Sequence, residues 1–328
     1  MGQMCKGNFR SIQKGVKMNL NLLLIQLKNA YSRSKYIKNW YIFYLIYLGI
    51  IKKGSIKFSN HISCEISKDD LRLFYFLEQL FINKMSNKCL IDNSKVLENL
   101  GKSDFIFNCK SYKWYIKRGY EFDSVNEILQ KFSEPDTFKT FSKFHGKLLV
   151  NVGANAGGYA IPASKKFKQV LALEPNPNVF YELNRNIKLN KIKNIKTLKI
   201  AAWSKKAKLE LFSPKNRFGY GGQVSTLLPK SMEKEGISYN THFSVNTITL
   251  NDLLRNQDTI DLLLIDAENA EVEILNGSDE ILNKTKAIII EVRDNTERTV
   301  KDILNNYGFN IKELDISKNS KNIFGKKY

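Results

Sequence analysis

The chain has 328 residues, of which 43% are hydrophobic and 12% aromatic, enough for one large domain with a smaller extension and too much for a disordered chain. Its net charge of +20 is uneven: residues 1–120 hold 21 Lys/Arg against 7 Asp/Glu (+14), and residues 121–328 hold 31 against 25 (+6). That excess suits an anionic membrane, a nucleic acid or an acidic glycan, or is simply a lysine-rich solvated surface. Four cysteines without a Cys-x-x-Cys pair, three histidines and no secretory signal argue against a zinc site, and we expect a cytoplasmic protein.

Residues 1–103 are predicted to form a basic, mainly helical extension. Helical apolar spacing occurs at 18–32 and 69–86. Between these, Trp40–Ile51 is nearly all apolar and is flanked by lysines, but it is shorter than the ~20 residues that span a bilayer. The segment suits a helix packed on the large domain, which we favour, or a helix lying peripherally on a membrane.

Residues 104–328 are predicted to form an α/β domain. A hairpin at 105–108 and 114–117 and a helix at 124–132 precede strands that alternate with helices, which is typical of a Rossmann-like, doubly wound, mostly parallel sheet. The expected strands are 148–152, 170–173, 197–202, 261–265 and 287–292, with a weak closing strand. The expected helices are 178–189, 250–255, 270–282 and 296–307. Residues 213–243 are expected to be irregular.

A glycine loop follows the first of these strands. Gly153 and Gly157 allow a tight turn and close approach of a ligand, and Glu174 ends the next strand 21 residues after Gly153. That spacing fits a carboxylate that binds a ribose hydroxyl in a nucleotide-binding unit. Asn155 stands where a dinucleotide fingerprint has its second glycine, which favours a cofactor without phosphates, such as S-adenosylmethionine.

Four ordered motifs resemble the FkbM-type methyltransferases over about residues 105–315. They are the glycine loop, Leu173–Pro177, Ala201–Ser204 and Asp266–Glu271. The resemblance implies S-adenosylmethionine as cofactor and a hydroxyl oxygen of a sugar, glycan or small metabolite as methyl acceptor. The cofactor-binding residues are then expected to be Asn151, Gly153, Asn155, Gly157, Glu174 and Asn176.

The resemblance also places Asp266, Glu268 and Glu271 on the acceptor side as the catalytic group. Asp266 ends an apolar strand, where burial can raise its pKa and make it a usable base. Glu268 and Glu271 could instead cap the following helix. Glu291, at the end of the next strand, could contact substrate or pair with Arg293.

The sequence departs from the family pattern at Asn151, where Asp is usual, at Leu264, where Lys is usual, and at Asn269, where Gly is usual. These changes affect the expected cofactor affinity and acceptor chemistry. Residues 218–225 could form a mobile cover or an exposed hairpin tip. His242 could be a base, although a lone histidine is more often a surface or packing residue.

Three alternatives remain open. Asp266, Asp294 and Asn295 could bind Mg²⁺, although no metal site is expected. The net charge of +20 suggests nucleic acid as an alternative methyl acceptor. The chain has no Pro-Pro sequence, which argues against a base amine as the target. The three departures from the family pattern suggest that the chain keeps a methyltransferase fold but serves only as a membrane-associated binding module.

Overall fold

The computed structural model describes residues 37–59, 62–67, 105–109, 112–116, 134–214, 225–229, 239–316 and 320–327. The helices expected at 18–32, 69–86 and 124–132 lie outside these residues. Within the described ranges, no helix is both long enough and apolar enough to cross a bilayer.

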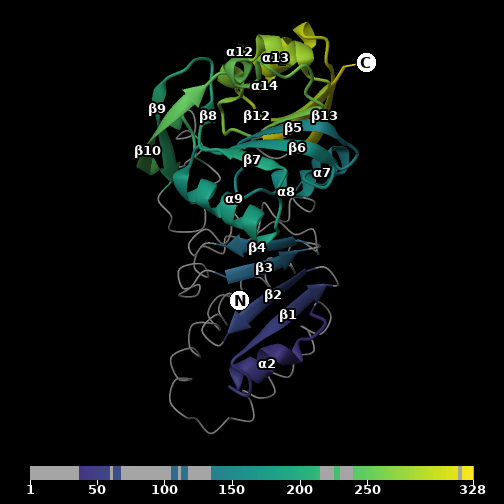
Figure 1. Cartoon of the computed structure of the whole chain (residues 1–328), viewed down its shortest axis with the longest axis vertical. Helices are drawn as coiled ribbons and strands as arrows, with labels where there is room; N and C mark the ends of the chain where they lie inside the picture. The colour runs from purple at the N-terminus through teal and green to yellow at the C-terminus, as the bar shows by residue number, and fades with distance from the viewer. Residues whose placement is uncertain are drawn as a thin grey trace.

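Seven strands form the central sheet, in the order β13-β14-β12-β11-β5-β6-β7 (Figure 1). The strands are β5 (Gly146–Val152), β6 (Phe167–Leu173), β7 (Ile195–Leu198), β11 (Leu262–Ile265), β12 (Ala287–Arg293), β13 (Asn310–Ile316) and β14 (Ser320–Lys326). The pairs from β7 to β12 are parallel, and only β14 runs against its neighbours. The predicted mostly parallel sheet is therefore confirmed, while the weak closing strand is a pair, β13 and β14.

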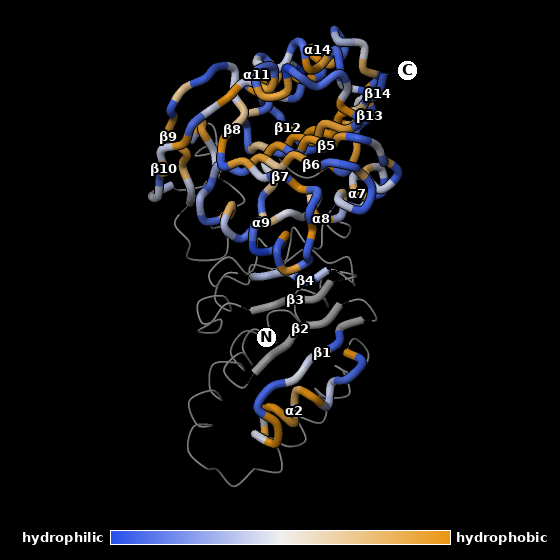
Figure 2. Tube along the Cα trace, in the orientation of Figure 1, coloured by the Kyte–Doolittle hydropathy of each residue, from blue (hydrophilic) through white to orange (hydrophobic). Residues whose placement is uncertain are grey.

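Helices cover both faces of this sheet, because its central strands are apolar on both sides. One face packs on α7 (Pro135–Phe141), α8 (Ala160–Ala163) and α9 (Pro177–Leu189), and the other on α11 (Leu250–Leu254), α12 (Glu271–Asn276), α13 (Asp279–Lys284) and α14 (Glu297–Asn306). Along β5, Leu149 faces the first set, while Leu148 and Val150 face the second. Figure 2 shows the hydrophobic strands between the two helical layers.

Two expectations for this domain were wrong in detail. Residues around 213 and 239–243 are not irregular, because β9 (Lys208–Pro214) pairs antiparallel with β10 (Tyr239–Ile248), and β10 also pairs with β8 (Ala201–Ala202). The helix expected at 270–282 is two helices. It breaks at Gly277, where a Cβ atom would lie 2.4 Å from the carbonyl oxygen of Trp203.

The helical prediction for the extension was wrong for residues 53–67. After the short helix α2 (Tyr41–Tyr47), β1 (Lys53–Ser59) and β2 (Ile62–Ser67) form an antiparallel sheet with the predicted hairpin, β3 (Phe105–Cys109) and β4 (Tyr112–Ile116). Strand pairing between distant segments outweighs local propensity here. Since β2 pairs with β3, this sheet crosses the predicted boundary between 1–103 and 104–328.

The small sheet joins the large domain through α9. The side-chain oxygen of Asn186 accepts a hydrogen bond from the Tyr115 backbone N–H at 2.5 Å, and its amide donates to the carbonyl of Ala156 at 3.0 Å. Asn186 is fully buried. One side chain thus connects β4, α9 and the glycine loop.

Candidate active site

The glycine loop lies between the carboxyl ends of β6 and β11. Gly153 has a φ of 74°, and a Cβ atom on it would lie 1.7 Å from the carbonyl oxygen of Asp266. The backbone N–H groups of Gly153 and Ala154 both donate to the carbonyl of Leu173, at 3.0 and 2.8 Å. Only glycine allows this backbone conformation and this close approach together.

Glu174 braces the loop from the end of β6. Its two carboxylate oxygens accept hydrogen bonds from the backbone N–H groups of Asn155 (3.0 Å) and Asn176 (2.8 Å). Asn155 has a φ of 46°, a left-handed conformation that asparagine tolerates better than most residues. Burial raises the pKa of Glu174 to about 7, although both hydrogen bonds oppose the rise.

Asn176 caps α9, since its side-chain oxygen accepts from the backbone N–H of Asn178 at 3.0 Å. Its amide donates to the hydroxyl of Ser225 at 3.0 Å. Ser225 is the one described residue of the predicted cover loop; residues 218–224 lie outside the described residues.

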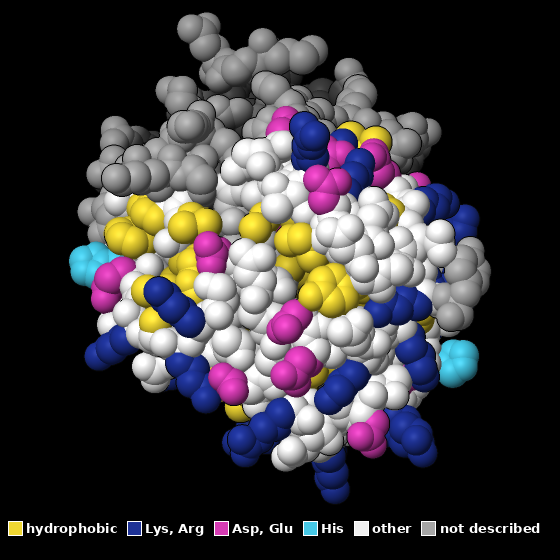
Figure 3. Space-filling view, turned by 90° about the horizontal axis from the view of Figure 1, so that it is seen from above, with side chains coloured by type: hydrophobic (Ala, Val, Ile, Leu, Met, Phe, Trp, Pro, Cys, Tyr) yellow, Lys and Arg dark blue, Asp and Glu magenta, His cyan; other side chains and the backbone are white. Residues whose placement is uncertain are grey.

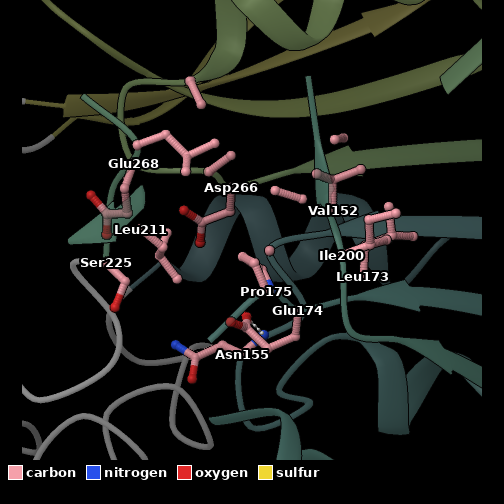
Figure 4. A pocket seen from close by; sticks show the side chains of 16 residues that line it. Val152, Asn155, Leu173, Glu174, Pro175, Ile200, Leu211, Ser225, Asp266 and Glu268 are labelled. Carbon is pink, nitrogen blue, oxygen red and sulfur yellow. Dashed lines mark hydrogen bonds between the residues drawn. The ribbon is translucent and has the colours of Figure 1, made fainter. Parts of the chain in front are cut away.

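A cleft of about 620 Å³, including the space at its mouth, opens at these strand ends (Figure 4). It is lined by Val152, Gly153, Asn155, Leu173, Glu174, Pro175, Ile200, Ala201, Ala202, Leu211, Ser225, Leu227, Asp266, Ala267, Glu268 and Ala270. The fold thus brings part of the predicted cofactor set and part of the predicted acceptor set to one cleft.

Asp266 ends β11 beside two other carboxylates. Oxygen atoms of Asp266, Glu268 and Glu291 lie within 4.8 Å of one another. Burial, followed by the negative charges of Glu291 and Glu268, holds the pKa of Asp266 well above its ordinary range. Arg293 pairs with Glu268 at 2.5 Å, and both side chains are largely buried. Asp294, raised above as a magnesium ligand, is not part of this cluster.

The turn from β11 into α12 is left-handed at two successive residues, Glu268 (φ 50°) and Asn269 (φ 78°). Asparagine accepts this conformation in place of the family's glycine. The hydroxyl of Thr226 donates to the carbonyl of Glu268 at 2.8 Å, and Glu271 accepts from the N–H of Asn269 at 2.9 Å. Burial raises the pKa of Glu271 to about 8. Glu271 braces this turn and is not among the residues that line the cleft.

Three other predicted residues lie behind the cleft or away from it. Asn151 is 1% exposed, and its side-chain amide has no hydrogen-bond partner among the described residues. Gly157 has a φ of 104° and packs against the side chains of Ile161 and Leu183. His242 lies on β10 near the ring of Phe212 and does not line the cleft.

Sequence reasoning missed Tyr159 and Glu134. The hydroxyl of Tyr159 donates to Glu134 at 2.9 Å, and its ring packs edge-on against Phe141 at 5.1 Å. Burial and the charge of Glu134 raise the pKa of Tyr159 well above its ordinary value, and Asp266 contributes to the rise. Only the position of Tyr159, directly after the glycine loop, could have indicated this pair.

Comparison with known families agrees with the site. Residues 151–311 match the model of the Methyltransferase FkbM domain. The chain contains an FkbM-family methyltransferase domain. This match includes the predicted cofactor residues and the predicted acceptor-side carboxylates.

Two curated methyltransferases are similar to the FkbM domain. Methyltransferase sdnD of Sordaria araneosa is 30% identical over 160 residues, which are 40% of this chain and 60% of that protein. Methyltransferase 1 of Beauveria bassiana (strain ARSEF 2860) is 26% identical over 177 residues, 49% of this chain and 71% of that protein. A crystal structure of methyltransferase FkbM from Methylobacillus flagellatus KT aligns at 14% identity with a TM-score of 0.37, over 63% of this chain and 54% of that one.

The family implies S-adenosylmethionine as the cofactor, and the residues that line the cleft suit its nucleoside part for two reasons. Gly153 and Asn155 of the glycine loop line the cleft, and the Glu174 carboxylate stands at the end of β6, where a ribose diol would be recognised. Each Glu174 oxygen accepts one backbone N–H, which leaves lone pairs for two ribose hydroxyls. The residues present therefore suit the nucleoside part of this cofactor.

Proposed function

We propose that this chain is an S-adenosylmethionine-dependent O-methyltransferase whose acceptor is a hydroxyl of a sugar, a glycan or a small metabolite. The observation that carries the proposal is the shared cleft. Glu174 enters it from β6 and Asp266 from β11, on the two sides of β5. The carboxylate that we assign to the nucleoside and a buried carboxyl group with a raised pKa thus line the same cleft.

On the cofactor side, Glu174 would bind the ribose, and Gly153 and Asn155 would present the backbone of the loop. Asn151, Gly157 and Asn176 would act from behind, since they hold the strand end, the loop and the start of α9. S-adenosylmethionine, when bound, supplies an electrophilic methyl group on a sulfonium. The protein supplies position, and positioning alone contributes up to about 7–11 kcal/mol in favourable cases.

On the acceptor side, Asp266 would accept the proton of the attacking hydroxyl. Its raised pKa makes the ionised form a stronger base, at the cost of a smaller ionised fraction near neutral pH. Glu268 would orient the acceptor while Arg293 neutralises its charge, and Glu271 would hold the turn that carries both. We expect kcat/KM to rise with pH as Asp266 ionises.

The test begins with calorimetric titration of the whole chain with S-adenosylmethionine and S-adenosylhomocysteine. Transfer of a labelled methyl group to panels of sugars, small alcohols and RNA then follows. Asp266→Asn should lower kcat by about 10²–10⁴-fold and change the cofactor Kd by only a few fold. Asp258→Asn, at an exposed position, is the matched control.

Three outcomes would count against the proposal. A folded native chain that binds neither ligand would favour a binding module without activity. Transfer to RNA alone would favour a nucleic-acid methyltransferase. Full activity of Asp266→Asn would show that Asp266 is not the base, without contradicting the assigned cofactor site.

A further inference from the structure

The helix α2 and the residues before it pack on β1 of the small sheet. The side chain of Asn39 donates to the carbonyl of Ser55 at 2.7 Å and accepts from the N–H of Lys57 at 2.6 Å. Phe43 and Ile46, on the inner face of the helix, are fully buried. The predicted packing of Trp40–Ile51 on the large domain is therefore wrong in its partner, because α2 packs on β1 of the small sheet instead.

Large apolar side chains are exposed on α2 and in the turn that follows it. Tyr41 is 53% exposed, Leu48 58% and Ile50 65%. Gly49, with a φ of 76°, makes the turn from which Leu48 and Ile50 both project. We call Tyr41, Leu48 and Ile50 the apolar tip. Exposed apolar side chains flanked by lysines are typical of proteins that lie on membrane interfaces.

The charge around the apolar tip is of one sign. Residues 37–59 contain Lys38, Lys52, Lys53 and Lys57, all exposed, and no Asp or Glu. The same bias covers the whole start of the chain, where residues 1–64 hold 11 Lys/Arg and the first acidic residue is Glu65. By contrast, Figure 3 shows Lys/Arg and Asp/Glu side chains interspersed over the opposite end of the molecule.

The apolar tip is also placed far from the active site. In Figure 1, α2 lies at the end of the described structure opposite α12, α13 and α14, with the small sheet between it and the FkbM domain. A flat surface could therefore meet α2 without covering the cleft.

We propose that the apolar tip and its lysines dock this protein on an anionic lipid bilayer. Aliphatic side chains at the centre of the patch gain nothing from a nucleic-acid backbone but enter the acyl boundary of a membrane. The exposed lysines of the same segment complement the charge of acidic headgroups. This inference is independent of the proposed methyl transfer.

The test is flotation of the full chain with vesicles of phosphatidylcholine alone and of phosphatidylcholine with phosphatidylserine. The native chain should float with the anionic vesicles, and less well as salt is raised. Leu48→Ser combined with Ile50→Ser should weaken binding about tenfold or more, since two aliphatic side chains lose their burial. Lys52→Glu combined with Lys53→Glu should weaken it by a similar factor.

Ile316→Ser is the matched control, because Ile316 is an isoleucine that is 71% exposed on β13. It should float like the native chain. All substituted side chains are exposed, so each variant should fold. An unchanged melting temperature would confirm this. The proposal is overturned if the native chain ignores anionic vesicles, or if the tip variants bind as well as the control. It is overturned equally if the tip variants only convert a dimer to a monomer on gel filtration.

Discussion

Glu174→Gln should make the stability of the protein less dependent on pH and should weaken cofactor binding. In the native chain the Glu174 carboxyl is buried, and burial raises its pKa from 4.5 to about 7. The folded state therefore holds the Glu174 proton more tightly than the unfolded state. The contribution of this proton to the unfolding free energy is complete below about pH 4.5 and is lost as the pH rises through about 7. Glutamine has nearly the same shape and cannot ionise, so the variant escapes this pH-dependent loss. Its single amide oxygen can accept only one of the two backbone N–H groups, and this cost is the same at every pH.

The size of the effect follows from the same pKa values. A rise of about 2.5, at about 1.4 kcal/mol for each pKa unit, corresponds to about 3 kcal/mol. We therefore expect the unfolding free energy of Glu174→Gln, relative to the native chain, to increase by about 3 kcal/mol between about pH 4.5 and pH 8. Loss of a hydrogen bond to a charged group should meanwhile weaken S-adenosylmethionine binding by about 10- to 100-fold.

Urea unfolding at several pH values, with calorimetric titration of the cofactor, measures both effects. Glu280→Gln is the control, since Glu280 is exposed on α13, and it should show neither effect. If the difference between Glu174→Gln and the native chain is the same at every pH, Glu174 ionises normally and the argument from burial fails. If the variant binds the cofactor as the native chain does, the ribose assignment fails.

Two further substitutions test the site. Gly153→Ala should destabilise the protein by at least about 3 kcal/mol in urea unfolding, because its Cβ would overlap the carbonyl oxygen of Asp266. Gly308→Ala, which has a similar positive φ but open space around it, should cost only about 1 kcal/mol; equal losses would show that backbone strain alone matters. Arg293→Gln should cost about 3 kcal/mol by leaving the largely buried Glu268 carboxylate without its salt bridge. Adding Glu268→Gln should restore most of that loss, and additive losses would contradict a direct pair.

Much of the FkbM domain could be predicted locally. Strands such as Leu262–Ile265 are short apolar runs, and α9 begins at an asparagine cap followed by proline, so their identity depends on neighbouring residues alone. The left-handed turn at Asn269 and the tight turn at Gly153 were likewise readable, because residue type restricts the backbone directly.

The N-terminal sheet was not readable in this way. Strands β1 and β2 are held by pairing with each other and, through Cys64 and Phe107, with a hairpin some forty residues later. The spacing of apolar residues in one sequence does not indicate which distant strand will pair with it. The same holds for β10, whose strand character depends on the antiparallel register with β9.

The sequence by itself determined the order of the central parallel strands and most of the helices between them, the glycine loop and the residue types at those strand ends, since these depend on local sterics and periodicity. Only the tertiary structure decided which of those residues share the cleft. Asp266 and Glu268 line it, whereas Glu271 turns inward to brace Asn269, and Arg293 pairs with Glu268. The physical reason is that burial and charge pairing depend on distances between strands, which no stretch of the chain specifies alone.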